Sequence, residues 1–357
     1  MKVMIAAGGT GGHIYPALAL AEVLKKKEPD SEVIFFGSDD RMEAKVIPEH
    51  GYKFYGMHVA STYGGIGNKI KSVFSMMKTQ KQAEKILQKE KPDICVGFGN
   101  YISVPLIQAA HHLHIPTMIH EQNSFAGKAN RFLSDKVDAI VGCYESNLKE
   151  MPKEKQRILG NPEATLAADT VFDPDMLVKM GLSLDKPFVI FMMGSLGSSS
   201  VSEVIDQACP LFDDSYQCII ASGTSNDYQF HYASNDHIKI VEYVDGKAML
   251  KGCALAVLRA GATTMAEVGS IGCASVLIPS PYVPNNHQFY NASELVKKDA
   301  AVMIEEKDLT PQLLADTVNG LMKDTDKLQK MRDNAKKQGK RDAAYQMIDW
   351  MEELIHD

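Results

Sequence analysis

Long apolar runs are missing from this sequence. No stretch of its 357 residues approaches the roughly 20 consecutive apolar residues that a membrane-spanning helix needs. The apolar start, Met1 to Ala7, runs directly into Gly8 and Gly9, so it is too short for the core of a signal peptide. We therefore expect a protein that stays in the cytosol and crosses no membrane.

Cysteine is sparse, and its pattern argues against two kinds of structural support. The six cysteines form no CxxC pair, and no histidine stands at zinc-binding spacing from them. They are Cys95, Cys143, Cys209, Cys218, Cys253 and Cys273. Scattered cysteines in a cytosolic chain are typically reduced and buried. We expect neither a disulfide nor a structural metal.

Basic residues are outnumbered. The chain has 38 lysines and arginines against 45 aspartates and glutamates, a formal net charge of -7. Nucleic acid as a main partner would need a concentrated basic face, so we expect no nucleic-acid partner. The sign reverses locally between Lys69 and Lys81, which hold four lysines and no acidic residue.

The sequence does contain enough chain for two domains of comparable size. Short apolar runs alternate with helical patterns, which is typical of a parallel sheet with helices on both faces. In the first half the expected strands are 2–7, 32–37, 94–98, 117–120 and 139–143, and the helices include 15–26, 66–88 and 103–112. In the second half the expected strands are 188–193, 216–222, 238–242, 255–258 and 274–279, with a helix at 201–212.

A polar stretch, Thr165 to Pro187, separates the two halves and looks like a connector with a short helix rather than core. We place the boundary at its start, with residues 1–162 as an N-terminal domain and 163–340 as a C-terminal domain. A terminal helix at about 341–357 carries apolar anchors and is expected to pack back on the first domain. The expected fold class is α/β, with two doubly wound Rossmann-like domains.

The first loop suited to ligand binding is Gly8-Gly9-Thr10-Gly11-Gly12-His13, between a buried strand and a helix. Such a loop presents backbone N–H groups and a positive helix end to an anion, and glycine allows a diphosphate to approach closely. We interpret it as a phosphate-binding loop. Two alternatives stay open: a tight turn, and a dinucleotide site, although Ile14 stands where G-x-G-x-x-G needs its third glycine.

Two further loops follow strands at the same expected sheet edge. Gly97 to Tyr101 carries a second glycine pair, and His120 to Asn123 brings four polar side chains. Ligands of open α/β sheets bind at this edge. Four polar residues in a row favour a binding site over a simple helix cap.

Three loops of the second half have similar features. Gly194 to Ser198 repeats the glycine turn, and its Ser195 can donate to a phosphate oxygen. Arg259 to Glu267 opens a helix with small residues, and the Glu267 carboxylate can accept from two ribose hydroxyls. Pro279 to Gln288 offers amides and an imidazole to a sugar. A solvated glutamate and a plain surface loop are the alternatives for the last two.

The motifs resemble one family when taken together. They are GGTGGH at residues 8–13 followed by Pro16-Ala17, Asp40-Arg41-Met42-Glu43, His120-Glu121-Gln122-Asn123, Gly160-Asn161-Pro162, Gly194-Ser195, Arg259 to Glu267, and Gln288 with Asn291-Ala292. Their order and spacing resemble the MurG family, bacterial transferases that add N-acetylglucosamine from UDP-N-acetylglucosamine to lipid I and so make lipid II for peptidoglycan. The sequence departs from the family at Glu163-Ala164, where an arginine is usual.

The resemblance implies a GT-B fold whose two domains face each other across a cleft. It also implies an inverting hexosyltransferase without a tightly bound metal or a cofactor. The implied role is cell-wall synthesis, and through it cell shape and division. The implied location is peripheral, at the cytoplasmic face of the cell membrane, with an anionic membrane surface as a partner beside the two substrates.

The resemblance also assigns residues to the two substrates. On the acceptor and diphosphate side these are Gly8, Gly9, Thr10, Gly11, Gly12, His13, Gly99, Asn100, Tyr101, Glu121 and Asn123. On the donor side these are Thr10, Gly11, Gly12, Asn123, Ser195, Val244, Arg259, Ala262, Thr263, Thr264, Glu267, His287 and Gln288. In the family Glu267 would bind the ribose, Val244 the uracil edge and Gln288 the sugar hydroxyls.

His13 is the candidate general base, because an imidazole titrates near neutral pH. The alternative, that His13 only binds the diphosphate, stays open. Three other interpretations of the whole chain also stay open. They are a UDP-N-acetylglucosamine 2-epimerase-like isomerase, a divergent paralogue with an altered donor, and a non-catalytic scaffold.

A lipid-linked acceptor implies a membrane-binding role for the basic segment between Lys69 and Lys81. Apolar residues recur at helical spacing with lysines beside them: Ile66, Ile70, Val73, Phe74 and Met77, with Lys69, Lys71, Lys78 and Lys81. Such a helix suits the surface of an anionic membrane. A helix packed on its own domain with solvated lysines is the alternative.

Overall fold

The chain forms two compact units in a computed structural model that describes all residues except 59–65, 150, 195–196, 224–226, 233 and 357, and no side chains for residues 66–74 and 147. The N-terminal unit comprises Met1–Leu166 with Asp342–Asp357, and the C-terminal unit comprises Ala167–Arg341. The expected boundary after residue 162 thus lies four residues before the observed one, which falls inside a helix, α6 (Glu163–Asp169).

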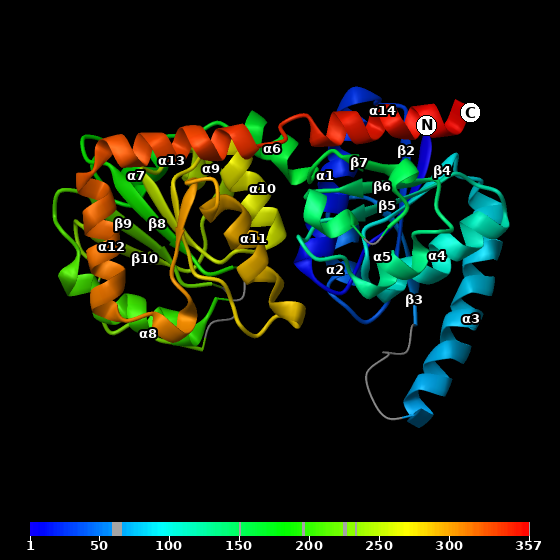
Figure 1. Cartoon of the computed structure of the whole chain (residues 1–357), viewed down its shortest axis with the longest axis horizontal. Helices are drawn as coiled ribbons and strands as arrows, with labels where there is room; N and C mark the ends of the chain where they lie inside the picture. The colour runs from blue at the N-terminus through cyan, green and yellow to red at the C-terminus, as the bar shows by residue number, and fades with distance from the viewer. Residues whose placement is uncertain (59–65, 150, 195–196, 224–226, 233, 357) are drawn as a thin grey trace. The chain divides into compact units, whose positions relative to one another are not determined.

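Within the described residues, the N-terminal unit contains a seven-stranded parallel sheet of order β3-β2-β1-β4-β5-β6-β7 (Figure 1). The strands are β1 (Lys2–Ala6), β2 (Glu32–Ser38), β3 (Lys53–Met57), β4 (Ile94–Gly97), β5 (Thr117–Glu121), β6 (Ala139–Gly142) and β7 (Gln156–Ile158). The helices are α1 (Gly11–Lys27), α2 (Glu43–Glu49), α3 (Ile66–Glu90), α4 (Asn100–His112), α5 (Lys128–Leu133) and the C-terminal α14 (Ala343–His356).

Helices cover both faces of this sheet because its strands are apolar on both sides. In β1, Val3 and Ile5 join the core beneath α1 and α14, whereas Met4 and Ala6 join the core beneath α3 and α4. This alternation is the period of two of a strand. Helix α14 packs on α1, and its Trp350 is buried in the first of these cores. Figure 1 shows both chain ends at this unit.

The C-terminal unit repeats the architecture with six parallel strands among its described residues, in the order β10-β9-β8-β11-β12-β13. The strands are β8 (Phe188–Met192), β9 (Gln217–Ala221), β10 (Ile238–Val241), β11 (Leu255–Leu258), β12 (Ser275–Leu277) and β13 (Ala301–Met303). The helices are α7 (Asp175–Lys179), α8 (Ser199–Ala208), α9 (Gly246–Gly252), α10 (Ala262–Ile271), α11 (His287–Val296), α12 (Pro311–Lys323) and α13 (Thr325–Gln338). Two parallel, helix-covered sheets confirm the predicted doubly wound α/β class.

Some sequence expectations were wrong in detail. Helix α1 begins at Gly11 and not at Tyr15, because Thr10 is already the extended residue before the helix. The stretch from Thr165 to Pro187 is not only a connector, since Leu177 and Leu182 are buried in the core. The short strands β3, β7 and β13 were not expected.

Two general features of the chain were also expected from composition. Within the described residues, no helix has both the length and the apolar composition to span a bilayer. All six cysteines are free thiols, and five of them are buried.

Candidate functional site

Each unit has a point where the strand order reverses. In the N-terminal unit this lies between β1 and β4, and in the C-terminal unit between β8 and β11. At such a point the loops that follow the two neighbouring strands lead away in opposite directions and leave a crevice between them. Ligands of doubly wound sheets bind in this crevice. The sequence-predicted loops after β1, β4, β8 and β11 therefore sit where this topology builds a site.

The glycine loop after β1 ends in the first turn of α1. Thr10 has extended backbone angles and makes no side-chain cap, and the amides of His13 and Ile14 donate to the Thr10 carbonyl. Gly11 and Gly12 occupy the first helical positions, where an amide has no acceptor within the helix. Their N–H groups and the positive end of α1 are suited to an anion, and ligand contact by this loop stays a prediction.

His13 lies beside this turn and over the next loop. Its Nδ1 is 2.8 Å from Thr10 Oγ1, and a Cβ on Gly99 would lie 3.3 Å from its Cδ2 atom. Gly99 has φ +84°, so glycine serves both the backbone angle and the close approach of the ring. If Nδ1 donates to Thr10, Nε2 is the nitrogen that can accept a proton. The geometry thus allows a general base.

Asn100 is used by the protein itself. Its Nδ2 donates to the Gly8 carbonyl at 2.9 Å, and its Oδ1 accepts from the Tyr101 amide at 2.6 Å. The side chain fastens the glycine loop to the start of α4. Tyr101 is half-buried, and burial raises the pKa of its hydroxyl. Contact of either residue with an acceptor stays a prediction.

Glu121 is also engaged by its own loop. Its buried carboxylate accepts from the amides of Asn123 and Gly127 at 3.1 and 2.8 Å and from Asn130 Nδ2 at 2.8 Å. Burial raises the pKa of Glu121, and these hydrogen bonds oppose the rise. The carboxylate organises the loop that presents Asn123, which is half-buried. Ligand contact by Glu121 and Asn123 stays a prediction.

His120 and Gln122 also hydrogen-bond to their own chain. His120 Nε2 donates to the Gly160 carbonyl at 3.0 Å, and burial lowers its pKa to about 4, so the ring is neutral. Gln122 is buried, with Nε2 3.4 Å from the Phe98 carbonyl. Three of the four polar residues expected at this edge are therefore buried and hydrogen-bond to their own chain: His120, Glu121 and Gln122.

In the C-terminal unit, α10 begins with Ala262, Thr263 and Thr264 after the extended residue Gly261, which makes no side-chain cap. The first N–H groups of this helix have no acceptor within it. Thr263 Oγ1 is shielded from solvent and makes no hydrogen bond in the structure. Glu267 is half-buried one turn further on. These features suit an anionic ligand, and donor contact by them stays a prediction.

Arg259 is almost buried and already paired. Its Nη1 donates to Glu306 Oε2 at 2.6 Å and to the Ile278 carbonyl at 3.1 Å, and its Nη2 donates to Ser198 Oγ at 2.7 Å. The guanidinium therefore connects β11 to the residue that precedes α8. Gly194, four residues before Ser198, has φ +89°. Sequence reasoning missed Glu306, whose partner lies 47 residues away in the chain.

The remaining donor candidates lie in one half-exposed stretch and one core position. Gln288 Oε1 accepts from the Ser280 amide at 2.9 Å, and His287 Nδ1 donates to the Pro284 carbonyl at 2.8 Å. Burial lowers the pKa of His287. Val244 is buried. Ser195, the predicted phosphate contact, lies outside the described residues.

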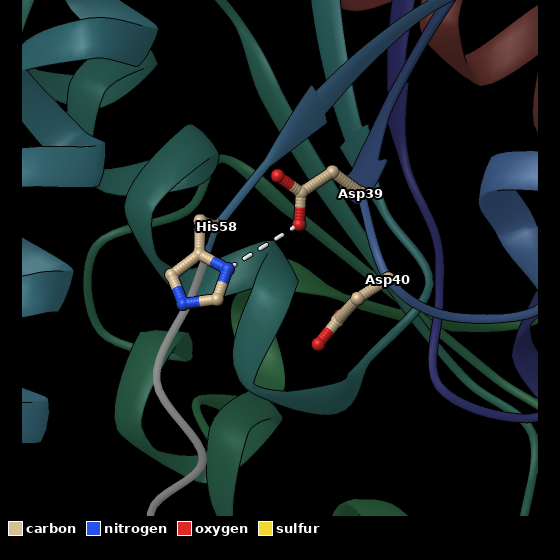
Figure 2. A group of neighbouring side chains, drawn as sticks. All are labelled: Asp39, Asp40 and His58. Atoms are coloured by element: carbon tan, nitrogen blue, oxygen red, sulfur yellow. Dashed lines mark ion pairs between the residues drawn. The ribbon is translucent and has the colours of Figure 1, made fainter.

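Within the part of the chain that the structure describes, one group of side chains has the spacing to hold a metal ion. Asp39, Asp40 and His58 converge after β2 and β3, as Figure 2 shows. His58 Nδ1 lies 3.5 Å from Asp39 Oδ1, and Ser38 Oγ donates to Asp40 at 2.5 Å and lowers the pKa of that carboxyl. All three side chains are exposed, and two of them pair with each other. We assign no metal centre to this group, and a reaction without a metal stays a prediction.

Comparison with known proteins places these features in a family. Residues 3–141 match the glycosyltransferase family 28 N-terminal domain, and residues 188–347 match its C-terminal domain. A protein of Limosilactobacillus fermentum, named UDP-N-acetylglucosamine–N-acetylmuramyl-(pentapeptide) pyrophosphoryl-undecaprenol N-acetylglucosamine transferase, is 38% identical over 365 residues, covering 100% of this chain and 99% of that protein. A protein of the same name from Latilactobacillus sakei is 37% identical over 369 residues, covering 99% and 100%.

A solved structure agrees with these relatives. The crystal structure of Acinetobacter baumannii MurG is 25% identical to this chain and superposes with a TM-score of 0.79 over 99% of both chains. This similarity confirms the predicted GT-B class. The chain therefore belongs to glycosyltransferase family 28 and, within it, to the MurG family of N-acetylglucosamine transferases.

Proposed function

We propose that this protein transfers N-acetylglucosamine from UDP-N-acetylglucosamine to the C4 hydroxyl of the N-acetylmuramoyl-pentapeptide of lipid I. The product is lipid II, the lipid-linked disaccharide used in peptidoglycan synthesis. The observation that supports this function most is the full-length similarity to transferases of that name. The 2-epimerase alternative lacks such support.

The reaction inverts the anomeric carbon. The acceptor oxygen bonds to C1 of N-acetylglucosamine as the bond from C1 to the UDP oxygen breaks, and UDP leaves as an anion. His13 takes the proton of the hydroxyl. The N–H groups at the starts of α1 and α10 are suited to stabilise phosphate charge on the two substrates without a metal.

The two units divide the substrates in this proposal. The N-terminal unit binds the acceptor diphosphate at Gly11 and Gly12, with Thr10, His13 and Asn123 at the rim. The C-terminal unit binds the donor. This division of the substrates is supported by the helix start that each unit has at its strand reversal, where N–H groups are available.

The donor side uses four kinds of contact. The first residues of α10 bind the diphosphate, Glu267 the ribose, Val244 the uracil edge, and Gln288 the sugar hydroxyls. Glu267 is half-buried on the helix that carries the N–H groups, which is compatible with a ligand lying across its first turns. Ser195 adds a phosphate contact in this proposal.

The enzyme acts at the cytoplasmic face of the cell membrane as a peripheral protein. Helix α3 packs on α4 (Figure 1). Met77 in the middle of α3 is 54% exposed, and Lys78 and Lys81 on the same helix are exposed. Exposed apolar and cationic side chains on one helix suit an anionic lipid surface. The remaining residues of the predicted patch have side chains outside the described part of the chain.

Vesicle binding tests the membrane partner. Sedimentation with vesicles containing anionic lipid should weaken with salt and after Lys78→Glu and Lys81→Glu together, because each cation near such a surface contributes about 1 kcal/mol. The control is Lys89→Glu, one residue before the end of the same helix, and it is compared with each single reversal, Lys78→Glu or Lys81→Glu. Binding of the unchanged protein to neutral vesicles at high salt that equals its binding to anionic vesicles would contradict the proposal.

The transferase reaction is tested with radiolabelled UDP-N-acetylglucosamine and a lipid I analogue. The expected product is a labelled disaccharide lipid, formed in proportion to enzyme and abolished by omitting the acceptor. The same incubation without acceptor is examined for UDP-N-acetylmannosamine, the product of a 2-epimerase. Absence of labelled lipid from correctly folded protein would refute the transferase function.

A further inference from the structure

A buried carboxylate lies against the glycine loop. Glu43, the first residue of α2, is fully buried, and its Oε2 accepts from the Gly9 amide at 2.9 Å. Its Oε1 accepts from the Ser38 amide at 3.0 Å. One side chain thus connects the loop after β1 to the end of the neighbouring strand β2.

The same peptide group is held from its other end. The Gly8 carbonyl and the Gly9 amide belong to one peptide bond, and the carbonyl accepts from Asn100 Nδ2 at 2.9 Å. Glu43 comes from the β2 side and Asn100 from the start of α4, so two elements far apart in sequence fix the plane of this single peptide group.

The glycines here make room for these two side chains. A Cβ on Gly8 would overlap Glu43 Oε1, and a Cβ on Gly9 would overlap Asn100 Nδ2. A Cβ on Gly37 would lie 2.8 Å from Glu43 Cγ. Gly9 also has φ +85°, which other residues rarely adopt. The glycine pattern therefore serves the contacts with Glu43 and Asn100 as well as ligand approach.

A carboxylate beside a phosphate-binding loop weakens the attraction between the loop and its ligand, because it repels the phosphate anion. It is a favourable choice for geometry, because a hydrogen bond from an amide to a carboxylate is stronger than one to a neutral acceptor. The bond also directs the Gly9 amide to Glu43. The amides of Gly11 and Gly12 then remain for the ligand.

We propose that Glu43 is a positioning residue that, together with Asn100, fixes the Gly8–Gly9 peptide group and thereby orients the first turn of α1. This turn carries Thr10 and His13. The inference about turnover rests on the proposed function, in which that turn binds the acceptor and His13 takes its proton. The inference about the peptide group rests on the contacts of Glu43 and Asn100 alone.

Glu43→Gln is the main test, because it keeps the shape and replaces one accepting oxygen with an NH2 group that cannot accept. Exchange with deuterated water, followed by NMR of protein labelled with 15N-glycine and 15N-serine, should become about tenfold faster at Gly9 or at Ser38, whichever amide faces the NH2 group and loses its charged acceptor. Glu49→Gln on the same helix, with an exposed side chain, should leave this exchange unchanged.

Kinetics separate positioning from general destabilisation. In Glu43→Gln, kcat/KM for the lipid I analogue should fall about tenfold while KM for the donor stays within about twofold. An equal loss on both substrates, or a loss that follows only the folded fraction, would overturn the positioning role. Unchanged exchange of both the Gly9 and the Ser38 amide would overturn the hydrogen bonds of Glu43.

Gly8→Ala provides an independent variant, since its Cβ must displace the Glu43 carboxylate. The double variant Gly8→Ala with Glu43→Gln should be no slower than the slower single variant, because both remove one interaction. Additive losses would overturn the proposal. If wild-type protein makes no labelled lipid, the proposed function fails, whereas the amide exchange still tests Glu43 without any substrate.

Discussion

Replacing Glu306 by glutamine should destabilise the C-terminal unit, because it leaves Arg259 charged and buried. The side chain of Glu306 is 11% exposed and that of Arg259 is 10% exposed, and Glu306 Oε2 lies 2.6 Å from Arg259 Nη1. Glutamine has the same shape and can still accept one hydrogen bond, so the change removes mainly the compensating charge. Removing one partner of a buried ion pair costs about 3–5 kcal/mol.

The expected loss lies at the lower end of that range. Arg259 keeps hydrogen bonds to the Ile278 carbonyl and to Ser198 Oγ, which continue to solvate part of the guanidinium. We therefore expect the free energy of unfolding to fall by about 3 kcal/mol. The matched control is Glu294→Gln, whose partner Lys297 is 67% exposed and 3.5 Å away. An exposed pair of this kind contributes less than about 1 kcal/mol.

Urea unfolding can assign the loss to one unit. The sequence has a single tryptophan, Trp350, and it belongs to the core of the N-terminal unit. Its fluorescence therefore reports that unit, whereas far-ultraviolet circular dichroism reports both units. In Glu306→Gln the circular-dichroism transition should shift to lower urea more than the fluorescence transition. A shift no larger than that of Glu294→Gln would refute the buried ion pair as a stabilising contact.

Two further predictions concern acid stability and substrate roles. Hydrogen bonds from Lys53 and Tyr55 lower the pKa of Glu90 from 4.5 to about 2, so its contribution is present above pH 4.5 and lost as the pH falls toward 2. Glu90→Gln should therefore lower stability by about 2 kcal/mol at pH 7, discounted for partly exposed lysines, and by much less at pH 2.5 in urea titrations. Glu267→Ala should raise the Kd for UDP about tenfold in calorimetry, whereas His13→Ala should leave it unchanged and lower turnover about a hundredfold; the reverse pattern would contradict the assigned roles.

Much of the fold follows from local sequence. The apolar runs that end at glycine predict β1, β4 and β8 within one or two residues, because parallel buried strands need apolar residues on both faces. The edge strands β3 and β7 were missed. β3 is only partly buried and contains Gly56, and β7 has three residues, so neither carries a clear pattern.

The loops of the candidate site were predictable from the sequence, but the hydrogen-bond partners of their polar residues were not. The loops after β1 and β4 were identified because they follow buried strands. Sequence could not show that Glu121 and Asn100 bind their own chain, since a carboxylate or amide accepts or donates in the same way to a ligand and to a backbone. A usable signal for Glu43 was its position at the start of a helix just beyond a strand at the same edge.

Each unit holds a loop in place with a charged side chain, and the charge is negative in one unit and positive in the other. In the N-terminal unit a carboxylate, Glu43, and an amide, Asn100, hold the glycine loop, whereas in the C-terminal unit a guanidinium, Arg259, holds Ser198 and is neutralised by Glu306. Neither arrangement places an uncompensated cation among these contacts. In the proposed function, affinity for the two diphosphates then comes largely from helix N–H groups, which are individually weak. For a lipid-linked acceptor, confinement to a membrane surface raises the local concentration and can supply what the loop does not. On this argument a water-soluble acceptor analogue should show a high KM that falls when a lipid chain and anionic vesicles are provided.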